Sequence, residues 1–410
     1  MRHHPVGFLP LCLAILCERC AAFMLSSSLV LMLCERYGYP RDEALRTAGL
    51  ITAAGYLGSL PGGLVADRLL GPRRALTGSL VLLMVGYALL MLPSLLALWP
   101  SVAVLVLGNS LFKPSAQAVL GRLYTPTDPR LDQAQVWLHL LINVGALFGA
   151  VVAGLATQRW GWAGCFAVSA SVVFLGRVCL SVGRRDVPVS KQTDAPSPSN
   201  TPTDHLSTWQ RVKTIAALTL AMLLFNMALG QVEGTLLVWT GQHVERTLLG
   251  FTVPPSWFVG LPALLVLVIA PAQLALLPGL QRRFGVFRLV AVGLLATSLA
   301  FLVLFPAVLW SKTQLVSMGW VVACHTLLVI GETLVGPLGL AQVLRLASPR
   351  LVGAVIGVWF ISGAVGYWLA GEIGALWVRW SPIGALSILT VLPLLGTGML
   401  FVEEIKGNAK

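Results

Sequence analysis

The chain has 410 residues, of which 57% are hydrophobic and only 11% are charged, and its mean hydropathy is +0.83. This composition excludes a soluble globular domain of that size. The net charge of +12 does not indicate nucleic-acid binding, because the cations gather in the segments between long apolar runs. A polytopic helical membrane protein is expected instead, since a helix satisfies its own backbone polar groups in lipid.

Apolar segments long enough to span a bilayer follow one another along the whole chain. We predict an all-α membrane protein with twelve transmembrane helices. The predicted helices lie near residues 8–34, 43–69, 72–94, 99–124, 131–158, 161–183, 211–240, 255–280, 284–308, 312–345, 349–378 and 382–404.

The distribution of cations indicates how these helices are oriented. Most of the 28 lysines and arginines fall on one side if the N-terminus is inside the cell. The positive-inside rule then places both termini in the cytoplasm, in the inner (plasma) membrane. Residues 184–210 are rich in Pro, Ser and Thr and are predicted to form a disordered cytoplasmic linker. This linker would separate an N-terminal six-helix bundle (1–183) from a C-terminal one (211–410).

Lys113 lies in the predicted helix 99–124, about 20 Å from its start, and therefore near the middle of the bilayer. A cation at that depth costs at least ~2.5–3.5 kcal/mol unless it meets a partner or a wet cavity. The alternative is a lysine that extends its ammonium to the interface. We interpret Lys113 as a functional charge, and Glu332 is the best candidate for its opposite charge.

Residues 62–74 read GGLVADRLLGPRR, which combines glycines, an acid and a basic run. They resemble the loop between helices 2 and 3 of the major facilitator superfamily, whose two halves pack as pseudo-repeats around a midplane site. Residues 279–285, GLQRRFG, look like a degraded counterpart in the second half. An ordinary basic loop is the alternative. The motif residues that match are Gly63, Asp67, Arg68, Arg73 and Arg74.

Longer stretches resemble one family of that superfamily, the proton-dependent oligopeptide transporters. The resemblance runs in register through nearly all predicted spans and omits the linker. It implies import of di- and tripeptides or peptide-like molecules by alternating access, driven by protons. We expect the proton gradient to suffice without a cofactor, and the protein to function as a monomer. The stretches that carry it are 108–133, 142–154, 245–258 and 331–371.

The resemblance also assigns substrate-binding roles. Glu332 matches the glutamate that meets the peptide amino terminus, and Lys113 matches the helix 4 lysine. A zwitterionic peptide calls for such opposite charges, together with amide and hydroxyl groups. Tyr56 and Trp359 could instead be packing aromatics, and Asn143 could form an interhelical hydrogen bond. The remaining matched positions are Tyr56, Asn143, Trp359 and Ser362.

The chain departs from the family pattern at positions that matter for coupling. Ile15 stands where the helix 1 motif E-x-x-E-R has its first acid, and Gly230 stands where helix 7 has an acid. Ser26 stands where an arginine would hold the peptide carboxylate. Proton coupling is therefore expected to rest on Glu332, with Glu18 beside Arg19 secondary.

Two histidines are candidates for proton relays, because imidazole titrates near neutral pH. His325 precedes Glu332 by two helical turns, and His139 precedes Asn143 by one. Each could instead be a hydrogen-bonded packing residue.

Three functions stay open: a proton-coupled peptide importer, a diverged transporter of another small molecule with altered coupling, and a non-transporting sensor or membrane partner. An enzyme is not expected, because no nucleophile–base pair or metal-ligand cluster is found. The seven cysteines are scattered and are expected to be structural thiols. The expected partners are the substrate, protons and the lipid bilayer, with no nucleic acid.

Overall fold

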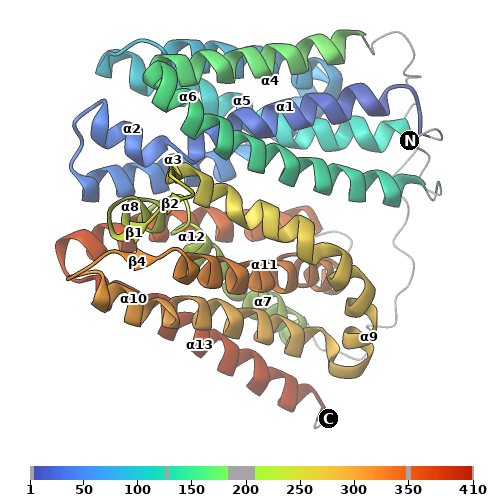
Figure 1. The fold of residues 1–410 in the computed structure, drawn as a ribbon. Coiled ribbons are helices and arrows are strands. Elements are labelled where there is room, and N and C mark those ends of the chain that lie inside the picture. Colours follow the sequence, from blue (N-terminus) through green and yellow to red (C-terminus); the bar gives the residue numbers. More distant parts are fainter. Residues whose placement is uncertain (1–3, 125–127, 129, 183–207, 348–351, 409–410) are drawn as a thin grey trace. The chain divides into compact units, whose positions relative to one another are not determined.

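The chain is almost entirely helical in the computed structural model (Figure 1). The structure describes residues 4–124, 128, 130–182, 208–347 and 352–408, so most of the expected linker at 184–210 lies outside it. The predicted fold class, an all-α polytopic membrane protein, is confirmed. The chain forms two compact units, Met1–Tyr39 with Ala54–Ser197, and Pro40–Ala53 with Pro198–Lys410.

The first unit contains the helices of the N-terminal half, apart from the beginning of α3. Its elements are α1 (Phe8–Ser26), α2 (Leu29–Glu35), the later part of α3 (Arg41–Val65), the π-helical turn η1 (Ala66–Leu70), α4 (Pro72–Leu90), α5 (Leu95–Leu123) and α6 (Arg130–Val182).

The second unit contains the beginning of α3 and all later elements. These are α7 (Thr208–Leu229), α8 (Thr235–His243), β1 (Val244–Glu245), β2 (Thr247–Leu248), β3 (Phe251–Thr252), α9 (Ser256–Leu302), α10 (Leu304–Trp310), β4 (Val316–Ser317), α11 (Gly319–Leu346), α12 (Val352–Arg379) and α13 (Pro382–Asn408).

Helices α6 and α9 each contain two predicted spans in one continuous run. Gly161 interrupts α6 with a φ of 66°, and Gly285 interrupts α9 with a φ of 76°. Only glycine adopts this left-handed region without steric cost. Both glycines lie at the boundaries predicted from hydropathy, next to 161 and 284. Ten described helical segments are long and apolar enough to cross a membrane, and the segment Gln133–Val182 alone holds two predicted spans.

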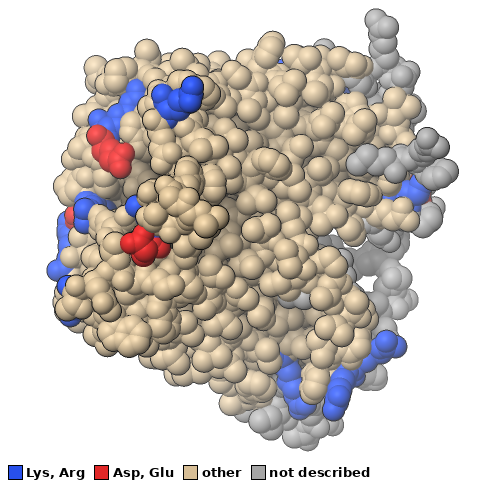
Figure 2. All heavy atoms as spheres, in the orientation of Figure 1, with Lys and Arg blue, Asp and Glu red and all other residues tan. Residues whose placement is uncertain are grey.

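Several predicted helices have different bounds in the structure, and the span 284–308 is divided between α9 and α10. The span 8–34 is interrupted between α1 and α2, where the Ser28 hydroxyl donates to the carbonyl of Met24. Such bonds from serine compete with the helical ladder. The span 211–240 is interrupted between α7 and α8, and the span 312–345 begins only at Gly319, because strand β4 precedes it. The charged atoms visible in Figure 2 gather near the ends of the helices.

Small residues let helices of the first unit approach closely. A Cβ added at Gly62 in α3 would lie 2.2 Å from the carbonyl oxygen of Ser110 in α5, and one at Gly58 would meet the Ser110 hydroxyl at 2.0 Å. Likewise, a Cβ at Gly149 in α6 would lie 2.3 Å from the carbonyl oxygen of Cys20 in α1. Backbone-to-backbone packing of this kind is typical of membrane helices. It fixes α3, α5, α1 and α6 as a frame for the polar residues described below.

The same kind of contact occurs in the second unit. A Cβ at Gly49, near the beginning of α3, would lie 2.8 Å from the Cα of Gly371 in α12. One at Gly331 in α11 would lie 3.0 Å from the carbonyl oxygen of Gly293 in α9. The second contact holds the turn of α11 that carries Glu332 against α9.

Candidate functional site

The first unit places a buried ion pair on α1. Arg19 Nε donates to Glu18 Oε2 at 2.5 Å, and its Nη2 donates to the other carboxylate oxygen. The same Nη2 lies 3.5 Å from Asn109 Oδ1 in α5. The Glu18 side chain is only 1% exposed and that of Arg19 is 14% exposed. A bidentate arginine neutralises the carboxylate, so both charges are tolerated inside the helix frame.

Lys113 lies beside Tyr56, as their helices cross at the glycine contacts of α3 and α5. The Lys113 ammonium is 4.9 Å from the centre of the Tyr56 ring, which is a cation–π distance. Both side chains are half-buried. Ile15, which replaces an acid of the family pattern, is buried and contributes an apolar surface to the same unit. The ring of Tyr56 is thus one partner of the Lys113 cation, and it carries no formal charge.

Asn143 and His139 lie one turn apart on α6. The Asn143 side-chain amide donates to the backbone carbonyl of His139 at 3.0 Å. The amide oxygen of Asn143 keeps its acceptor capacity, because only the NH₂ group takes part in this bond. Asn143 is half-buried and His139 is exposed.

In the second unit, Glu332 is half-buried on α11. Within the described ranges, no hydrogen bond or ion pair to its carboxylate is found. His325, two turns earlier, is 1% exposed, and its Nδ1 contacts the carbonyl of Val321 at 2.8 Å. Because a carbonyl only accepts, Nδ1 carries the proton in this contact. Nε2 is left without a partner in the described part of the chain.

Trp359 and Ser362 on α12 are both more deeply buried than Glu332. The Trp359 ring packs over Gly339 of α11, so closely that a Cβ there would lie 2.8 Å from Cη2. The Ser362 hydroxyl donates to the carbonyl of Trp359 at 2.7 Å. In this conformation, Trp359 therefore packs between helices and the Ser362 donor is used within α12.

Sequence reasoning assigned no role to Gln231, which the structure shows at the centre of a polar cluster. Its side-chain NH₂ donates to the carbonyls of Met227 and of Ala370 in α12, each at 3.1 Å. Its oxygen accepts from the Thr235 hydroxyl at 2.7 Å. These bonds connect the broken ends of α7 and α8 to α12. The signal in the sequence was an amide beside a glycine within an apolar span, but its partner in α12, Ala370, lies 139 residues away along the chain.

Gly230, beside Gln231, stands at a crowded position. A Cβ there would lie 2.6 Å from the Cβ of Ala370 and 3.1 Å from Cδ1 of Tyr367. No side chain fits without displacing α12. At the position where the family has an acid, this chain therefore has a close contact between α7 and α12.

The loop motif takes the form of a π-helical turn rather than an open loop. The turn η1 continues α3 and ends at Leu70. Gly71 follows with a φ of 75°, and α4 begins directly after it. Gly63 faces Pro114 of α5, and a Cβ added at Gly63 would lie 3.5 Å from the proline Cβ. Arg68 and Arg74 are exposed and Arg73 is half-buried. The side chain of Asp67 lies outside the described part of the structure.

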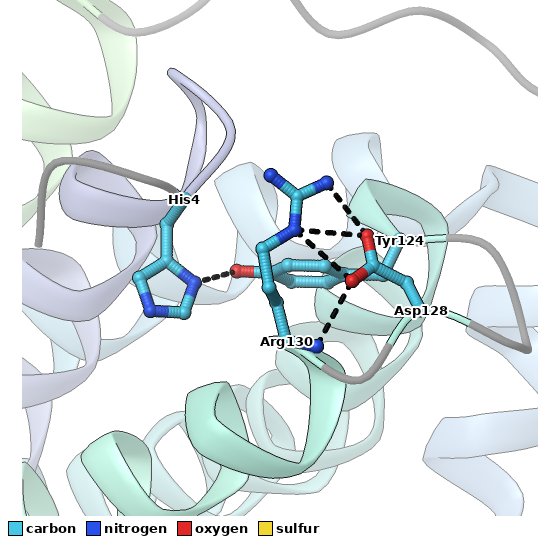
Figure 3. Close-up of polar contacts among 4 residues, drawn as sticks. All are labelled: His4, Tyr124, Asp128 and Arg130. Carbon is cyan, nitrogen blue, oxygen red and sulfur yellow. Dashed lines mark hydrogen bonds and ion pairs between the residues drawn. The ribbon is translucent and has the colours of Figure 1, made fainter.

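A second polar cluster lies at the end of α5 that follows Lys113. The Tyr124 hydroxyl is 2.8 Å from His4 Nδ1, and Figure 3 shows it directed toward that ring. Arg130 binds Asp128 through both its side chain and its backbone N–H. These bonds hold the pKa of the Asp128 carboxyl below its usual range. The N-terminal segment is thereby tied to the end of α5.

Charged residues also join α3 to α12 within the second unit. Arg379 pairs with Asp42, and Arg46 Nε lies 3.0 Å from Glu372 Oε2. Both pairs lie on the same side of the Gly49–Gly371 contact, before Gly49 in α3 and after Gly371 in α12, so this stretch of α3 is held by packing and by ion pairs.

Comparison with known proteins gives consistent matches over nearly the whole chain. Residues 11–402 match the Major Facilitator Superfamily. Dipeptide and tripeptide permease A from Pectobacterium carotovorum subsp. carotovorum is 25% identical, over 87% of this chain and 80% of the permease. Peptide transporter YePEPT from Yersinia enterocolitica subsp. palearctica is 26% identical, over 90% of this chain and 88% of the transporter.

A solved structure of a mutant of peptide transporter POT, in complex with sulfate, has the same fold. Its TM-score is 0.90 at 23% sequence identity, and the match covers 98% of this chain and 95% of that one. The resemblance to the oligopeptide transporter family noted from the motifs is thus confirmed by full-length matches.

Proposed function

Because this chain belongs to the Major Facilitator Superfamily, we propose that it is a secondary active transporter that imports di- and tripeptides or peptide-like molecules by alternating access. The chemistry of the site supports a zwitterionic substrate. The observation that carries the proposal is the half-buried Lys113 ammonium, which lies 4.9 Å from the ring of Tyr56 on the long apolar helix α5. Relatives named as dipeptide and tripeptide permeases and as peptide transporters point the same way.

Lys113 binds the carboxylate end of the substrate in this proposal. A tyrosine ring lowers the cost of a cation in the membrane without neutralising it, in contrast to a carboxylate partner. An ammonium has three N–H donors, so contact with a ring is compatible with contact to a carboxylate.

Glu332 binds the amino end of the substrate and carries the proton coupling. Its half-buried carboxylate has no ion-pair partner within the described ranges, so the ammonium of a peptide would form an ion pair with it. Glu18 is less suited to coupling, because both of its carboxylate oxygens are already engaged by Arg19. His325 is the candidate relay, since its Nε2 can accept a proton.

The transporter is further proposed to act as a monomer in the plasma membrane, with both termini in the cytoplasm. The excess of lysine and arginine on the predicted inner side supports this orientation. The proton gradient is the proposed energy source, and no cofactor is required.

Binding by purified protein tests the proposed substrate class. A dipeptide should raise the midpoint of thermal unfolding, because a ligand that binds only the folded state stabilises it. The same dipeptide with an acetylated amino group should raise it less, since it cannot pair with Glu332. Lys113→Ala and Glu332→Gln should weaken the effect, whereas Lys312→Ala and Glu43→Gln, at exposed positions, should not.

Stabilisation by acetylated and unmodified dipeptides alike would contradict the role of Glu332. Stabilisation by neither would favour the second candidate, a diverged transporter of another small molecule. The close packing around Gly230 is the observation that favours this second candidate, because it closes a position where the family pattern has an acid.

A further inference from the structure

The connection between α8 and α9 forms a small β structure with a polar base. Strand β1 pairs in parallel with β4, and β2 pairs with β3 as an antiparallel hairpin. At the base, Arg246 donates to the carbonyls of Gly241 and Val253 at 3.1 and 2.5 Å. Glu245 accepts from the backbone N–H of Thr247 at 2.9 Å, which lowers the pKa of its carboxyl. The charged groups of the connection are thus engaged by nearby backbone.

The tip of the hairpin is apolar, in contrast to its base. Leu249 and Gly250 form a two-residue turn, and both have positive φ, of 51° and 82°. Such turns favour Asn-Gly or Asp-Gly, so a leucine with positive φ is unusual there. No charged residue occurs between Thr247 and Trp257. An asparagine or aspartate would adopt this conformation with less strain than leucine. The leucine at this position therefore indicates that its side chain lies in an apolar environment.

Among the residues that the structure describes, none covers this tip. Leu249 is 101% exposed, and on either side of the turn Leu248 is 54% and Phe251 is 44% exposed. Phe251 and Trp257 pack against each other, with ring centres 5.6 Å apart. The apolar surface is therefore continuous from the turn to the first residues of α9.

Continuity with the membrane-spanning helices identifies what covers this surface. The hairpin joins the end of α8 to the beginning of α9, and its strands are only two residues long. Two strand residues extend about 7 Å, so the tip cannot leave the neighbourhood of the bilayer surface. Aromatic residues concentrate at that level of membrane proteins. Non-helical backbone does not enter the hydrocarbon core, which limits the hairpin to the interface.

We infer that the β2–β3 hairpin is an interfacial lipid anchor, which inserts Leu248, Leu249 and Phe251 into the boundary between headgroups and acyl chains. The partner is the lipid bilayer, on the side that the charge bias assigns to the exterior. The anchor fixes the level of the α8–α9 connection in the membrane. This inference about the hairpin does not depend on the substrate that we propose for the transporter.

Site-specific labelling in lipid nanodiscs tests this anchor. Cysteine is introduced as Leu249→Cys, as Leu248→Cys in case the turn does not tolerate the first change, and as Gln314→Cys for the control. Gln314 is exposed in the connection between α10 and β4, whose strand pairs with β1. The unsubstituted protein, whose seven cysteines all lie in helices, gives the background labelling. Each site receives an environment-sensitive fluorophore.

The label at 249 or 248 should lose about half of its emission when the nanodisc lipids carry a quencher on the acyl chain, because an interfacial side chain reaches that boundary. The label at 314 should not respond. Emission from 249 and 248 that responds no more than that from 314 would overturn the inference. Shielding from aqueous reagents without quenching by the lipids would also overturn it, because the tip would then contact protein.

Discussion

At the scale of single residues, the contact between Lys113 and Tyr56 makes the sharpest prediction. Tyr56→Phe keeps the ring face and should retain most of the affinity for a dipeptide, whereas Tyr56→Ala removes the ring. A cation–π contact contributes ~0.5–2 kcal/mol, so the alanine variant should bind roughly 2- to 30-fold more weakly. Titration of both purified variants measures this difference. Equal loss in both variants would mean that the hydroxyl, and not the ring, holds Lys113.

The charged residues of α1, α5 and α11 could be identified from sequence because a charge inside an apolar span is conspicuous. Their contacts could not be identified in this way. The sequence places Arg19 beside Glu18, but the approach of Asn109 to Arg19 depends on how α5 crosses the helix frame. Gln231 received no role, since its partner Ala370 is 139 residues away. The aromatic and hydroxyl side chains were the hardest to interpret, because burial decides whether Trp359 packs or binds.

At the scale of elements, the crowded contact between α7 and α12 explains why Gly230 cannot carry a side chain. Overpacking typically costs ~1–3 kcal/mol, so Gly230→Ala should lower the free energy of unfolding by about that amount. Ala370→Gly removes the Cβ that lies 2.6 Å from the added one. The double variant should therefore recover much of the loss, which thermal unfolding in detergent measures. Additive effects of the two substitutions would contradict the contact.

The ion pairs between α3 and α12 make a second prediction at this scale. Asp42→Asn should lower the midpoint of thermal unfolding more than Glu372→Gln, because the Asp42 side chain is 12% exposed and that of Glu372 is 36% exposed. Well-exposed pairs contribute little to stability. Combining Asp42→Arg with Arg379→Asp should restore part of the loss caused by either reversal alone. No recovery in that double variant would show that Asp42 acts without Arg379.

Element boundaries followed the sequence where one residue determines the backbone. Gly161 and Gly285 end one span and begin the next, as the change in hydropathy predicted. The interruption between α7 and α8 was not predicted, because one of the Gln231 bonds that stabilise it goes to the distant carbonyl of Ala370. The four short strands were missed as well, since two-residue strands have no periodicity to recognise.

At the scale of the whole molecule, the absence of an arginine at position 26 predicts the ligand preference. Ser26 is half-buried on α1, and Lys113 is the proposed cation for the peptide carboxylate. Discrimination against dipeptides with an amidated carboxyl end should therefore be weak, and Ser26→Arg should sharpen it. Competition between amidated and unmodified dipeptides for uptake measures both effects. Strong rejection of amidated dipeptides by the unsubstituted protein would contradict this account of the site.

The fold class could be predicted because the lipid bilayer determines it. Long apolar spans, cations gathered between them and a polar segment that divides the chain are sufficient evidence. Substrate and coupling were inferred from motif resemblance, because opposite charges on different helices are compatible with many zwitterions. The contribution of the structure is local. It shows Glu18 paired with Arg19, Lys113 on a tyrosine ring and Glu332 half-buried.

Uptake of a labelled dipeptide into proteoliposomes tests the central claim most directly. With an inward proton gradient, the unsubstituted protein should accumulate the dipeptide above its external concentration, and collapse of the gradient should abolish the accumulation. Glu332→Gln should lose accumulation and keep exchange of labelled for unlabelled dipeptide, whereas Glu43→Gln should behave like the unsubstituted protein. Accumulation that persists in Glu332→Gln, or uptake by the unsubstituted protein that ignores the gradient, would contradict the account.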